Sequence, residues 1–463
     1  EDFFTPDKKI LEINSKTGLY PLYVTHKIFR ARLGNVSEDK IPLDELRRLW
    51  DMTIADNVFV ICKTPMAKTI TRRTLLGYRA GSVNAHCFDD LINQLKNKAA
   101  QFLKNVTNKN FWNKGAGKMF FDAVVGNPPY QNATANTSDE PVYNYFIETA
   151  FKLSDKVSLV HPARCLFNAG KTPKDFNKRL LTNEHLKIIR YERDSRKFFP
   201  TSDIKGGVAI TLYDKNQTLE PIKLFIPFDE LIAIHQKAVV DNPNFSPFSE
   251  IIYPPEIYHF TRQFHEDNPN AANVLSDGHA DDLTTNIFEK LPQIFLNVKP
   301  DDGREYIQIL GLLKMRRVFK WIRRDWLNSP APLTKFKVLV PKSNGSGALG
   351  EVVSTPLVGS PLVGSPLVGS TQTFISVGAF DTRAEADSCI AYIRSKFCRV
   401  MLGILKVTQH NPPATWAKVP LQDFNPATSD IDWGGDVDGQ LYRKYKLTAA
   451  EIAFIEDKVR AMT

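Results

Sequence analysis

The segment from Phe121 to Tyr130, FDAVVGNPPY, constrains the fold of this chain more than any other. Its first part is a short run of apolar and β-branched residues bounded by glycine and proline. Such a run predicts a strand buried on both faces, as in a parallel sheet covered by helices. Ligands of such sheets bind at the carboxyl ends of the strands. The segment therefore predicts an α/β fold with a ligand site at Asn127-Pro128-Pro129-Tyr130.

The chemistry of this tetrapeptide indicates the kind of ligand. Both prolines lack an N–H group and have a fixed φ, so their carbonyl oxygens and the side-chain oxygen of Asn127 form a rigid edge of acceptors. An exocyclic amine would donate hydrogens to that edge, and the ring of Tyr130 offers a planar base a surface for stacking. Asn-Pro is also an ordinary turn signal, but the preceding strand and the following aromatic residue favour a binding site.

FDAVVGNPPYQ resembles the catalytic motif of gamma-class adenine-N6 DNA methyltransferases, which belong to bacterial restriction-modification systems and include combined restriction and modification enzymes. The resemblance implies a doubly wound, Rossmann-like domain that uses S-adenosyl-L-methionine to methylate an adenine flipped out of double-stranded DNA. It also implies that Asn127, Pro128, Pro129 and Tyr130 are catalytic. Related motifs occur in methyltransferases that act on RNA adenine and on protein glutamine, so the tetrapeptide alone leaves the substrate open.

In the gamma class the cofactor motif precedes the catalytic motif, and ILEINSKTGLY at 10–20 stands in that place. It is similar to the family's pattern of an acid, a proline and two glycines before an aromatic residue, with Ile13 in place of the proline and Lys16 in place of the first glycine. The segment 57–62 also predicts a strand, but no acid follows it to hold the cofactor ribose. The cofactor-binding residues that the resemblance implies are Glu12, Asn14, Gly18, Asp89 and Asn127.

Two further positions bear on the chemistry. A Phe-Pro loop in this family supplies an aromatic residue that packs against the extruded adenine, and Phe199 matches it, so Tyr130 and Phe199 are expected to sandwich the base. The alternative is that Phe199 is an apolar plug on a loop. His161 follows another expected core strand, but methyl transfer to an amine needs no strong base, so we expect no catalytic role for it.

The chain is long enough for two domains. We expect a catalytic domain at 1–225 and an α+β target-recognition domain at 226–463. Within the second, the segment 314–326 predicts a helix with apolar residues inside and cations outside, where they would reach phosphates. The DNA-binding residues expected on it are Lys314, Arg316, Arg317, Lys320, Arg323 and Arg324.

Two other segments of the second domain carry clear patterns. A capping box at Asp381-Thr382-Arg383-Ala384-Glu385 predicts the start of a long amphipathic helix that reaches about Leu405. The pentapeptide PLVGS occurs three times in succession at 356–370. A proline in each copy argues against a regular central strand, so we expect an extended loop, whose copy number would alter the reach of a recognition loop.

The net charge of +9 suits a polyanionic partner, although charge alone does not distinguish DNA from RNA or from an acidic membrane surface. We expect the C-terminal region to be basic, which favours DNA over RNA or protein as substrate. The five cysteines have no metal-ligand spacing, so no metal is expected, and they suggest the reduced thiols of a bacterial cytoplasm. No apolar run is long enough to span a membrane.

The chain starts at Glu1, with the cofactor motif almost at its beginning, so we expect a truncated N-terminus and an upstream or separate restriction endonuclease with a motor. The favoured function is a site-specific DNA adenine-N6 methyltransferase. The alternatives are an RNA adenine or protein-glutamine methyltransferase, and a catalytically weak DNA-binding or specificity module. Saturable binding of S-adenosylmethionine distinguishes an enzyme from such a module.

Overall fold

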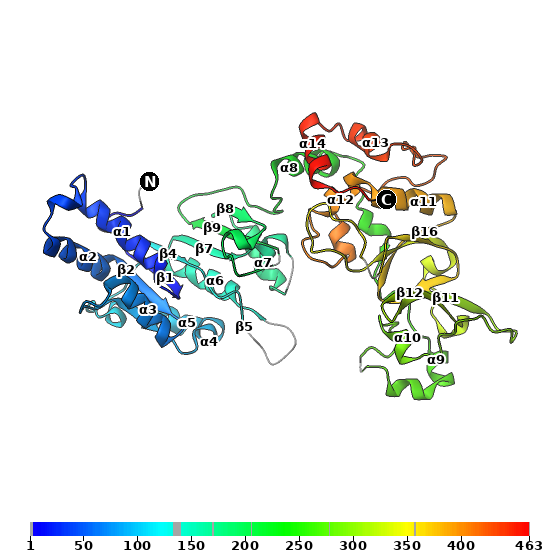
Figure 1. Ribbon diagram of the computed structural model, residues 1–463, viewed down its shortest axis with the longest axis horizontal. Coiled ribbons are helices and arrows are strands. Elements are labelled where there is room, and N and C mark those ends of the chain that lie inside the picture. Colours follow the sequence, from blue (N-terminus) through cyan, green and yellow to red (C-terminus); the bar gives the residue numbers. More distant parts are fainter. Residues whose placement is uncertain are drawn as a thin grey trace. The chain divides into compact units, whose positions relative to one another are not determined.

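The computed structural model describes residues 3–132, 140–168, 171–204, 206–276, 278–355 and 358–462. The chain forms two compact units, Glu1–Phe225 and Ile226–Thr463 (Figure 1). A catalytic domain at 1–225 and a target-recognition domain at 226–463 stay predictions. Each unit has its own sheets and its own core and is described by itself.

A seven-stranded sheet forms the centre of the N-terminal unit. Its strand order is β3-β2-β1-β4-β7-β9-β8, and only β9 runs antiparallel to its neighbours. The order reverses between β1 and β4, which is where doubly wound sheets bind ligands. The predicted α/β class is therefore confirmed for this mostly parallel sheet. The strands are β1 (Ile10–Ser15), β2 (Val58–Cys62), β3 (Asn84–Cys87), β4 (Ala123–Gly126), β7 (Lys156–Pro162), β8 (Leu186–Glu192) and β9 (Val208–Asp214).

Helices cover both faces of this sheet, which explains why β1, β2 and β4 are buried along almost their whole length. On one side α1, α2 and α3 pack together, and on the other α4, α5 and α6 do so (Figure 1). A two-stranded ribbon of β5 and β6 follows the tetrapeptide 127–130. The bounds are α1 (Leu19–Leu33), α2 (Leu43–Asn57), α3 (Pro65–Leu76), α4 (Leu91–Asn97), α5 (Ala99–Val106), β5 (Gln131–Asn132), β6 (Glu140–Pro141), α6 (Tyr143–Leu153) and α7 (Lys174–Leu181).

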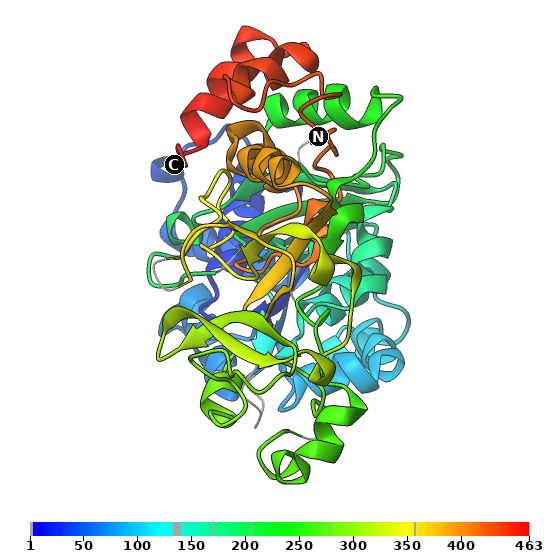
Figure 2. The same ribbon diagram turned by 90° about the vertical axis from the view of Figure 1, so that its right-hand side faces the viewer.

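The C-terminal unit contains two smaller sheets, with strand orders β10-β16-β13-β14 and β12-β11-β15. Helices α8, α12 and α14 pack against one another (Figures 1 and 2). The bounds are α8 (Asp229–His235), β10 (Ile252–Tyr253), α9 (Arg262–Asp267), α10 (Ile287–Lys290), β11 (Tyr306–Leu313), β12 (Arg316–Arg323), β13 (Phe336–Pro341), β14 (Leu362–Gly364), β15 (Val368–Ser370), β16 (Phe374–Phe380), α11 (Arg383–Arg394), α12 (Lys396–Leu402), α13 (Val437–Lys444) and α14 (Ala449–Lys458).

The helix predicted at 314–326 is wrong. Residues 306–323 form an antiparallel hairpin of β11 and β12, joined by the two-residue turn Lys314-Met315. Both turn residues have a positive φ, of 46° and 59°, as the tight turns of twisted hairpins require. Val318 and Ile322 share a face in a strand as well as in a helix, so their spacing did not distinguish the two structures.

Most of the cations expected to face solvent on this element are engaged. The Lys320 ammonium is buried and donates to Asn297 Oδ1. Arg317 donates to the carbonyl oxygen of Ser360 at 2.8 Å, and Arg323 pairs with Asp267 at 2.8 Å.

Arg324 donates to the carbonyl oxygen of Leu327 at 2.9 Å, so it is engaged too. Lys314 and Arg316, at the tip of the hairpin, are the two expected DNA-binding residues whose side chains are exposed.

The predicted capping box is confirmed, because Thr382 and Glu385 bond reciprocally across the first turn of α11. The single helix predicted to reach Leu405 is wrong, since the chain leaves the helical conformation at Ser395. Ser395 has a ψ of 149° and its side chain accepts the N–H of Cys398, so it begins a second helix, α12.

The PLVGS copies do not form one extended loop, although Pro356 and Leu357 of the first copy lie outside the described residues. The second copy supplies β14, an edge strand of one sheet, and the third supplies β15, an edge strand of the other. Pro361 and Pro366 stand just outside these strands. Proline excludes a central strand but not an edge strand, and both copies take the edge position.

Candidate active site

A recess of about 530 Å³ opens at the carboxyl end of β4, where the order of the sheet reverses. It brings together four of the five residues expected to be catalytic, all except Pro129. The residues that line it are Lys16, Asn127, Pro128, Tyr130, Gln131, Arg164, Phe199, Ser202, Asp203 and Ile204.

The end of β1 fixes the position of Asn127. A Cβ atom at Gly126 would lie 2.7 Å from the carbonyl oxygen of Ile13, so only glycine lets β4 approach β1 this closely. The Asn14 side-chain amide donates to the backbone oxygen of Asn127 at 3.0 Å. The side-chain oxygen of Asn127 is buried and has no hydrogen-bond partner among the described residues. This oxygen is thus a desolvated acceptor held at the sheet edge.

Tyr130 and Phe199 meet across the recess, but they do not form the expected sandwich. Their ring centroids are 6.4 Å apart and their planes are inclined at 73°, an edge-to-face contact. A flat base can therefore stack on one of these rings in this arrangement, not between both. Burial raises the pKa of Tyr130, and its hydroxyl oxygen is enclosed without a partner in the described part of the chain.

The loop that carries Phe199 is closed on itself by one serine. Ser195 Oγ donates to the carbonyl oxygen of Ser202 and accepts the N–H of Ile204, both at 2.8 Å. The N–H of Phe199 donates to the Ser195 carbonyl at 2.8 Å. These bonds fix the backbone of the loop on both sides of Phe199.

Glu12 lies within β1 and is buried. Desolvation raises the pKa of its carboxyl to about 7, against the opposing effects of a hydrogen bond from Ser15 and the charge of Lys16. One of its carboxylate oxygens has no partner within the described residues. Asn14, two residues later, has a φ of 81°, a conformation that asparagine tolerates better than most residues.

Gly18 begins α1 with a φ of 78°, and a Cβ atom there would lie 2.9 Å from the Cα atom of Thr71 in α3. The Thr74 hydroxyl donates to the carbonyl oxygen of Thr17 at 2.6 Å. Packing of the loop against α3 thus explains this glycine without a ligand. Lys16, which replaces the first glycine of the family's pattern, lines the recess instead.

Asp89 does not line the same recess as Asn127. It borders a neighbouring recess of about 260 Å³ together with Lys63, the residue that follows β2. Asp90, beside it, accepts the N–H of Asn93 at 3.2 Å and begins α4, so the helix explains this second acid. No carboxylate follows β2.

His161 is fully buried behind the recess, where Nε2 lies 3.2 Å from Thr211 Oγ1 and Nδ1 lies 3.0 Å from the carbonyl oxygen of Pro162. Burial lowers its pKa to about 4. A neutral, enclosed imidazole that is satisfied on both nitrogens serves the core.

Arg164 and Asp203 line the recess but were missed from the sequence. The Nε atom of Arg164 is buried without a partner among the residues described here. Arg164 follows β7 by two residues, so its place after an expected strand of a parallel sheet was an available signal. Asp203 lies on the irregular loop after Phe199 and had no such signal.

No cluster of three or more His, Cys, Asp or Glu side chains suited to a metal ion occurs in the described part of the chain. Within the same residues, no helix is long and apolar enough to cross a bilayer.

The N-terminal unit is thus an α/β domain with a doubly wound sheet and a polar recess at its switch point, the place where sheets of this kind bind ligands. Residues 56–199 of this domain match the family model of the Eco57I restriction-modification methylases. The match confirms, for this segment, the resemblance to methyltransferases of restriction-modification systems.

An uncharacterized adenine-specific methylase of Mycoplasma pneumoniae is 29% identical over 113 residues, which are 23% of this chain and 27% of that protein. The chain thus aligns with about a quarter of the length of this curated relative.

Two solved structures align with this chain at low sequence identity. The type IIL restriction-modification enzyme MmeI in complex with DNA is 11% identical, with a TM-score of 0.46 over 98% of this chain and 73% of that chain. The type ISP enzyme LlaBIII bound to DNA is 12% identical, with a TM-score of 0.41 over 88% of this chain and 36% of its own.

Proposed function

We propose that this chain is a site-specific DNA adenine-N6 methyltransferase of a restriction-modification system, with S-adenosyl-L-methionine as cofactor. The observation that carries the proposal is the side-chain oxygen of Asn127. It is a buried acceptor without a partner among the described residues, and it borders a recess walled by Tyr130 and Phe199. The match of residues 56–199 to a methylase family supports the same reaction.

The residues at this edge fit such a cofactor. Buried polar atoms without a partner are rare in folded proteins, and those of Glu12 and Asn127 occur together near the switch point. We assign Glu12, Asn14, Gly18 and Asp89 to the cofactor region, with Lys16 as an added cation. Bound S-adenosylmethionine would supply a methyl group on a positively charged sulfur.

The proposed reaction is direct transfer. The lone pair of the adenine amine forms the new N–C bond while the S–C bond breaks, and the amine then releases a proton to solvent. Asn127 Oδ1 and the Pro128 carbonyl oxygen orient the amine and stabilise the positive charge that develops on it. Pro129 keeps this edge rigid, and no residue forms a covalent bond with the substrate.

The adenine must leave the duplex, since its amine is paired there and cannot line up with the methyl donor. Unstacking costs a few kcal/mol, and stacking on one aromatic ring recovers roughly 1 to 3 kcal/mol. The edge-to-face contact of Tyr130 with Phe199 implies that one ring turns when the base enters. Arg164, at the rim, is suited to a phosphate of the extruded nucleotide.

We assign target recognition to the unit Ile226–Thr463. On its hairpin, Lys314 and Arg316 keep their expected role as phosphate contacts, because their side chains are exposed. The other four cations of β12 and its exit, Arg317, Lys320, Arg323 and Arg324, already have partners within the fold.

The test is modification-sensitive sequencing of DNA from a methylation-free host that expresses the intact chain or Asn127→Ala. We expect N6-methyladenine at one sequence motif in the first case and its loss in the second. Loss of an interaction that stabilises transition-state charge reduces the rate on the order of 10²- to 10³-fold. An identical mark in both strains would remove the role of Asn127.

A second candidate is a specificity module that binds DNA with little catalysis. It is favoured by Lys16 in the cofactor loop and by Lys63 where a ribose-binding acid is expected. Calorimetric titration of the intact chain with S-adenosylmethionine distinguishes the two candidates, because saturable binding excludes the specificity module. RNA, and release factors as protein substrates, should be tested in the same methylation assay. The C-terminal unit has no net positive charge, so its charge does not favour DNA over these substrates.

A further inference from the structure

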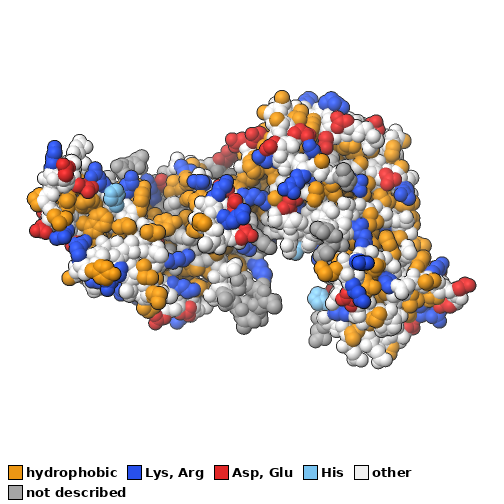
Figure 3. Space-filling model, in the orientation of Figure 1, with side chains coloured by type: hydrophobic (Ala, Val, Ile, Leu, Met, Phe, Trp, Pro, Cys, Tyr) orange, Lys and Arg blue, Asp and Glu red, His pale blue; other side chains and the backbone are white. Residues whose placement is uncertain are grey.

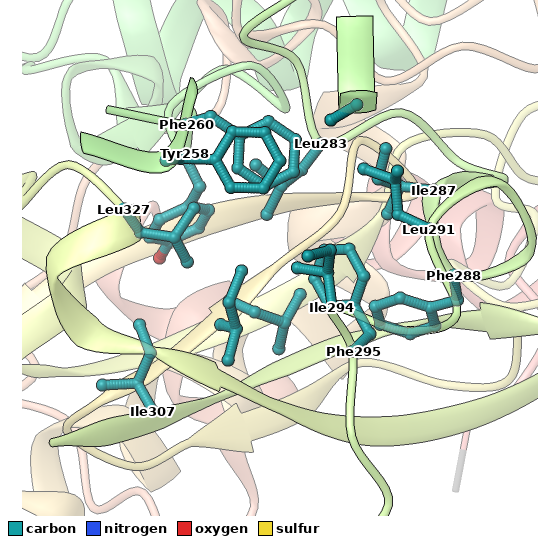
Figure 4. Close-up of a cluster of buried hydrophobic side chains, with 14 of the residues drawn as sticks. Tyr258, Phe260, Leu283, Ile287, Phe288, Leu291, Ile294, Phe295, Ile307 and Leu327 are labelled. Carbon is teal, nitrogen blue, oxygen red and sulfur yellow. The ribbon is translucent and has the colours of Figure 1, made fainter. Parts of the chain in front are cut away.

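The outer face of the β11–β12 hairpin carries a second recess, of about 390 Å³, in the C-terminal unit. In the hairpin, alternate residues face opposite sides. Ile307, Ile309 and Ile322 are buried in the core cluster of this unit, of which Ile307 is labelled in Figure 4. The opposite face forms the floor of the recess with Gln308, Phe319 and Trp321, and Gln308 stands directly across from Trp321.

The wall of this recess is residues 363–368, which join the second PLVGS copy to the third. Hydrogen bonds hold the wall from both sides. The buried ammonium of Lys337 donates to the Ser365 carbonyl oxygen at 2.7 Å, and the N–H of Gln308 donates to the Leu367 carbonyl oxygen at 3.1 Å. Leu367 has a φ of 60°. Floor and wall are thus fixed before any partner binds, which lowers the entropy cost of binding.

The chemistry of the lining suits the edges of bases. Phe319 is 43% exposed, and the Lys299 ammonium lies 5.9 Å from the centroid of the Trp321 ring. Among the described residues, Lys299 is the one charged side chain that lines the recess, so the described lining is positive and contains no carboxylate. The side-chain amide of Gln308 makes no hydrogen bond with the described residues. A free glutamine amide can pair with both N6 and N7 of adenine in the major groove, which is wide enough for a two-stranded ribbon.

We infer that this recess binds duplex DNA, with Gln308 reading one base and Lys299 contacting a phosphate. This inference rests on the proposed function and adds a recognition site to it. Phe319 makes apolar contact at the same step, for which a thymine methyl group is the suitable partner. The second and third PLVGS copies form the wall of the recess. The number of copies in the chain therefore determines which residues of this segment face the DNA.

Two variants of the full chain test the site, Gln308→Ala and Lys299→Ala. Val298→Ser is the matched control, because Val298 adjoins Lys299 and is 76% exposed but does not line the recess. The methylated sequences are read from a randomised DNA library, and the affinity for duplex DNA is measured by fluorescence anisotropy at several salt concentrations. Titration with S-adenosylmethionine reports whether each variant keeps an intact N-terminal unit.

We expect Gln308→Ala to lose the preference at one base pair by about tenfold to a hundredfold, with unchanged cofactor affinity. Lys299→Ala should weaken binding to all duplexes alike and lower the slope of log affinity against log salt by about 1. Val298→Ser should behave as the unaltered chain does.

The outcomes separate the inference from the proposed function. If the unaltered chain methylates DNA and both variants match it in sequence preference and affinity, the recess has no such role. If the chain binds duplex DNA without methylating it, and the variants weaken that binding, the recess stands and the methyltransferase proposal falls. A chain that binds no duplex DNA, or whose variants lose binding only to single-stranded RNA, overturns the inference.

Discussion

At the scale of single residues, burial decides what the polar groups of the sheet edge can do. Asn127 and Glu12 both carry a buried oxygen without a partner in the described part of the chain, whereas His161, equally buried, is bonded on both nitrogens. Desolvated but unpaired acceptors are expensive to keep in a fold. Asn127 lines the recess, so its unpaired oxygen favours a binding role, and the satisfied histidine favours a structural one.

Phe198 and Phe199 provide a matched pair for the stacking role. Phe199 lines the recess, while Phe198 lies under the Arg190 guanidinium, 4.8 Å from it. We expect Phe199→Ala to reduce kcat/KM for DNA about tenfold to a hundredfold, because stacking of the extruded base contributes roughly 1 to 3 kcal/mol. Phe198→Ala should change it little. If Phe199→Ala and Phe198→Ala lose the same amount of kcat/KM in steady-state methylation assays, Phe199 serves only as an apolar plug of its loop.

Glu12 should make the N-terminal unit less stable at higher pH. Its pKa is raised to about 7 in the fold, so the folded state holds a proton that the unfolded state releases near pH 4.5. Stability falls as pH rises from about 4.5 to about 7, by on the order of 3 kcal/mol.

In the variant Glu12→Gln this side chain cannot ionise, so the fall in stability with rising pH that Glu12 causes is lost. We expect the variant to gain stability relative to the unaltered chain between pH 5 and pH 8, measured from urea unfolding of the N-terminal unit. If the unfolding free energies of the variant and the unaltered chain differ by the same amount at pH 5 and at pH 8, Glu12 is solvated in the folded protein and its pKa is not raised.

At the scale of elements, the spacing of Val318 and Ile322 did not decide the structure of 306–323, because these residues share a face in a strand as well as in a helix. The turn Lys314-Met315 offers a test of the hairpin. Asn-Gly is the preferred pair for a turn with two positive φ values. We expect Lys314→Asn with Met315→Gly to stabilise the C-terminal unit by about 0.5 to 1 kcal/mol.

In a helix the same glycine would instead cost about 1 kcal/mol. The sign of the shift in the urea midpoint therefore distinguishes hairpin from helix. A matched control is Met315→Ala, which keeps side chains at both positive-φ positions of the turn and should not stabilise the unit.

At the scale of the whole molecule, the positive charge belongs to the N-terminal unit. Residues 1–225 contain 35 Lys and Arg against 24 Asp and Glu, and residues 226–463 contain 25 against 27. The expectation of a basic C-terminal region is wrong, and Figure 3 shows acidic and basic side chains interspersed over the visible face of that unit. The sequence-independent attraction to DNA should therefore come mainly from the catalytic unit.

The connection between the units is short. The ring of Phe225 packs 5.2 Å from that of Phe167 in the N-terminal unit, and the ring of Phe228 packs 5.3 Å from that of Phe454 in the C-terminal unit. Only Ile226 and Pro227 lie between these anchors. A short link keeps the effective concentration of a bound target high at the catalytic recess.

Insertion of ten Gly and Ser residues after Ile226 should therefore lower kcat/KM for DNA several-fold, since the effective concentration falls with linker length. Cofactor affinity should not change, because the inserted residues lie outside the recess. An unchanged methylation rate would contradict the delivery of DNA by the C-terminal unit.

The sequence by itself determined the strand that ends directly before Asn127, the α/β class of the first unit and the capping box of α11, because each depends on local patterns of apolar, turn and capping residues. Only the tertiary structure decided that Lys320 is buried, that two identical PLVGS copies join different sheets, and that Tyr130 meets Phe199 edge to face. These outcomes depend on which distant segments supply partners, and identical local sequences can find different ones.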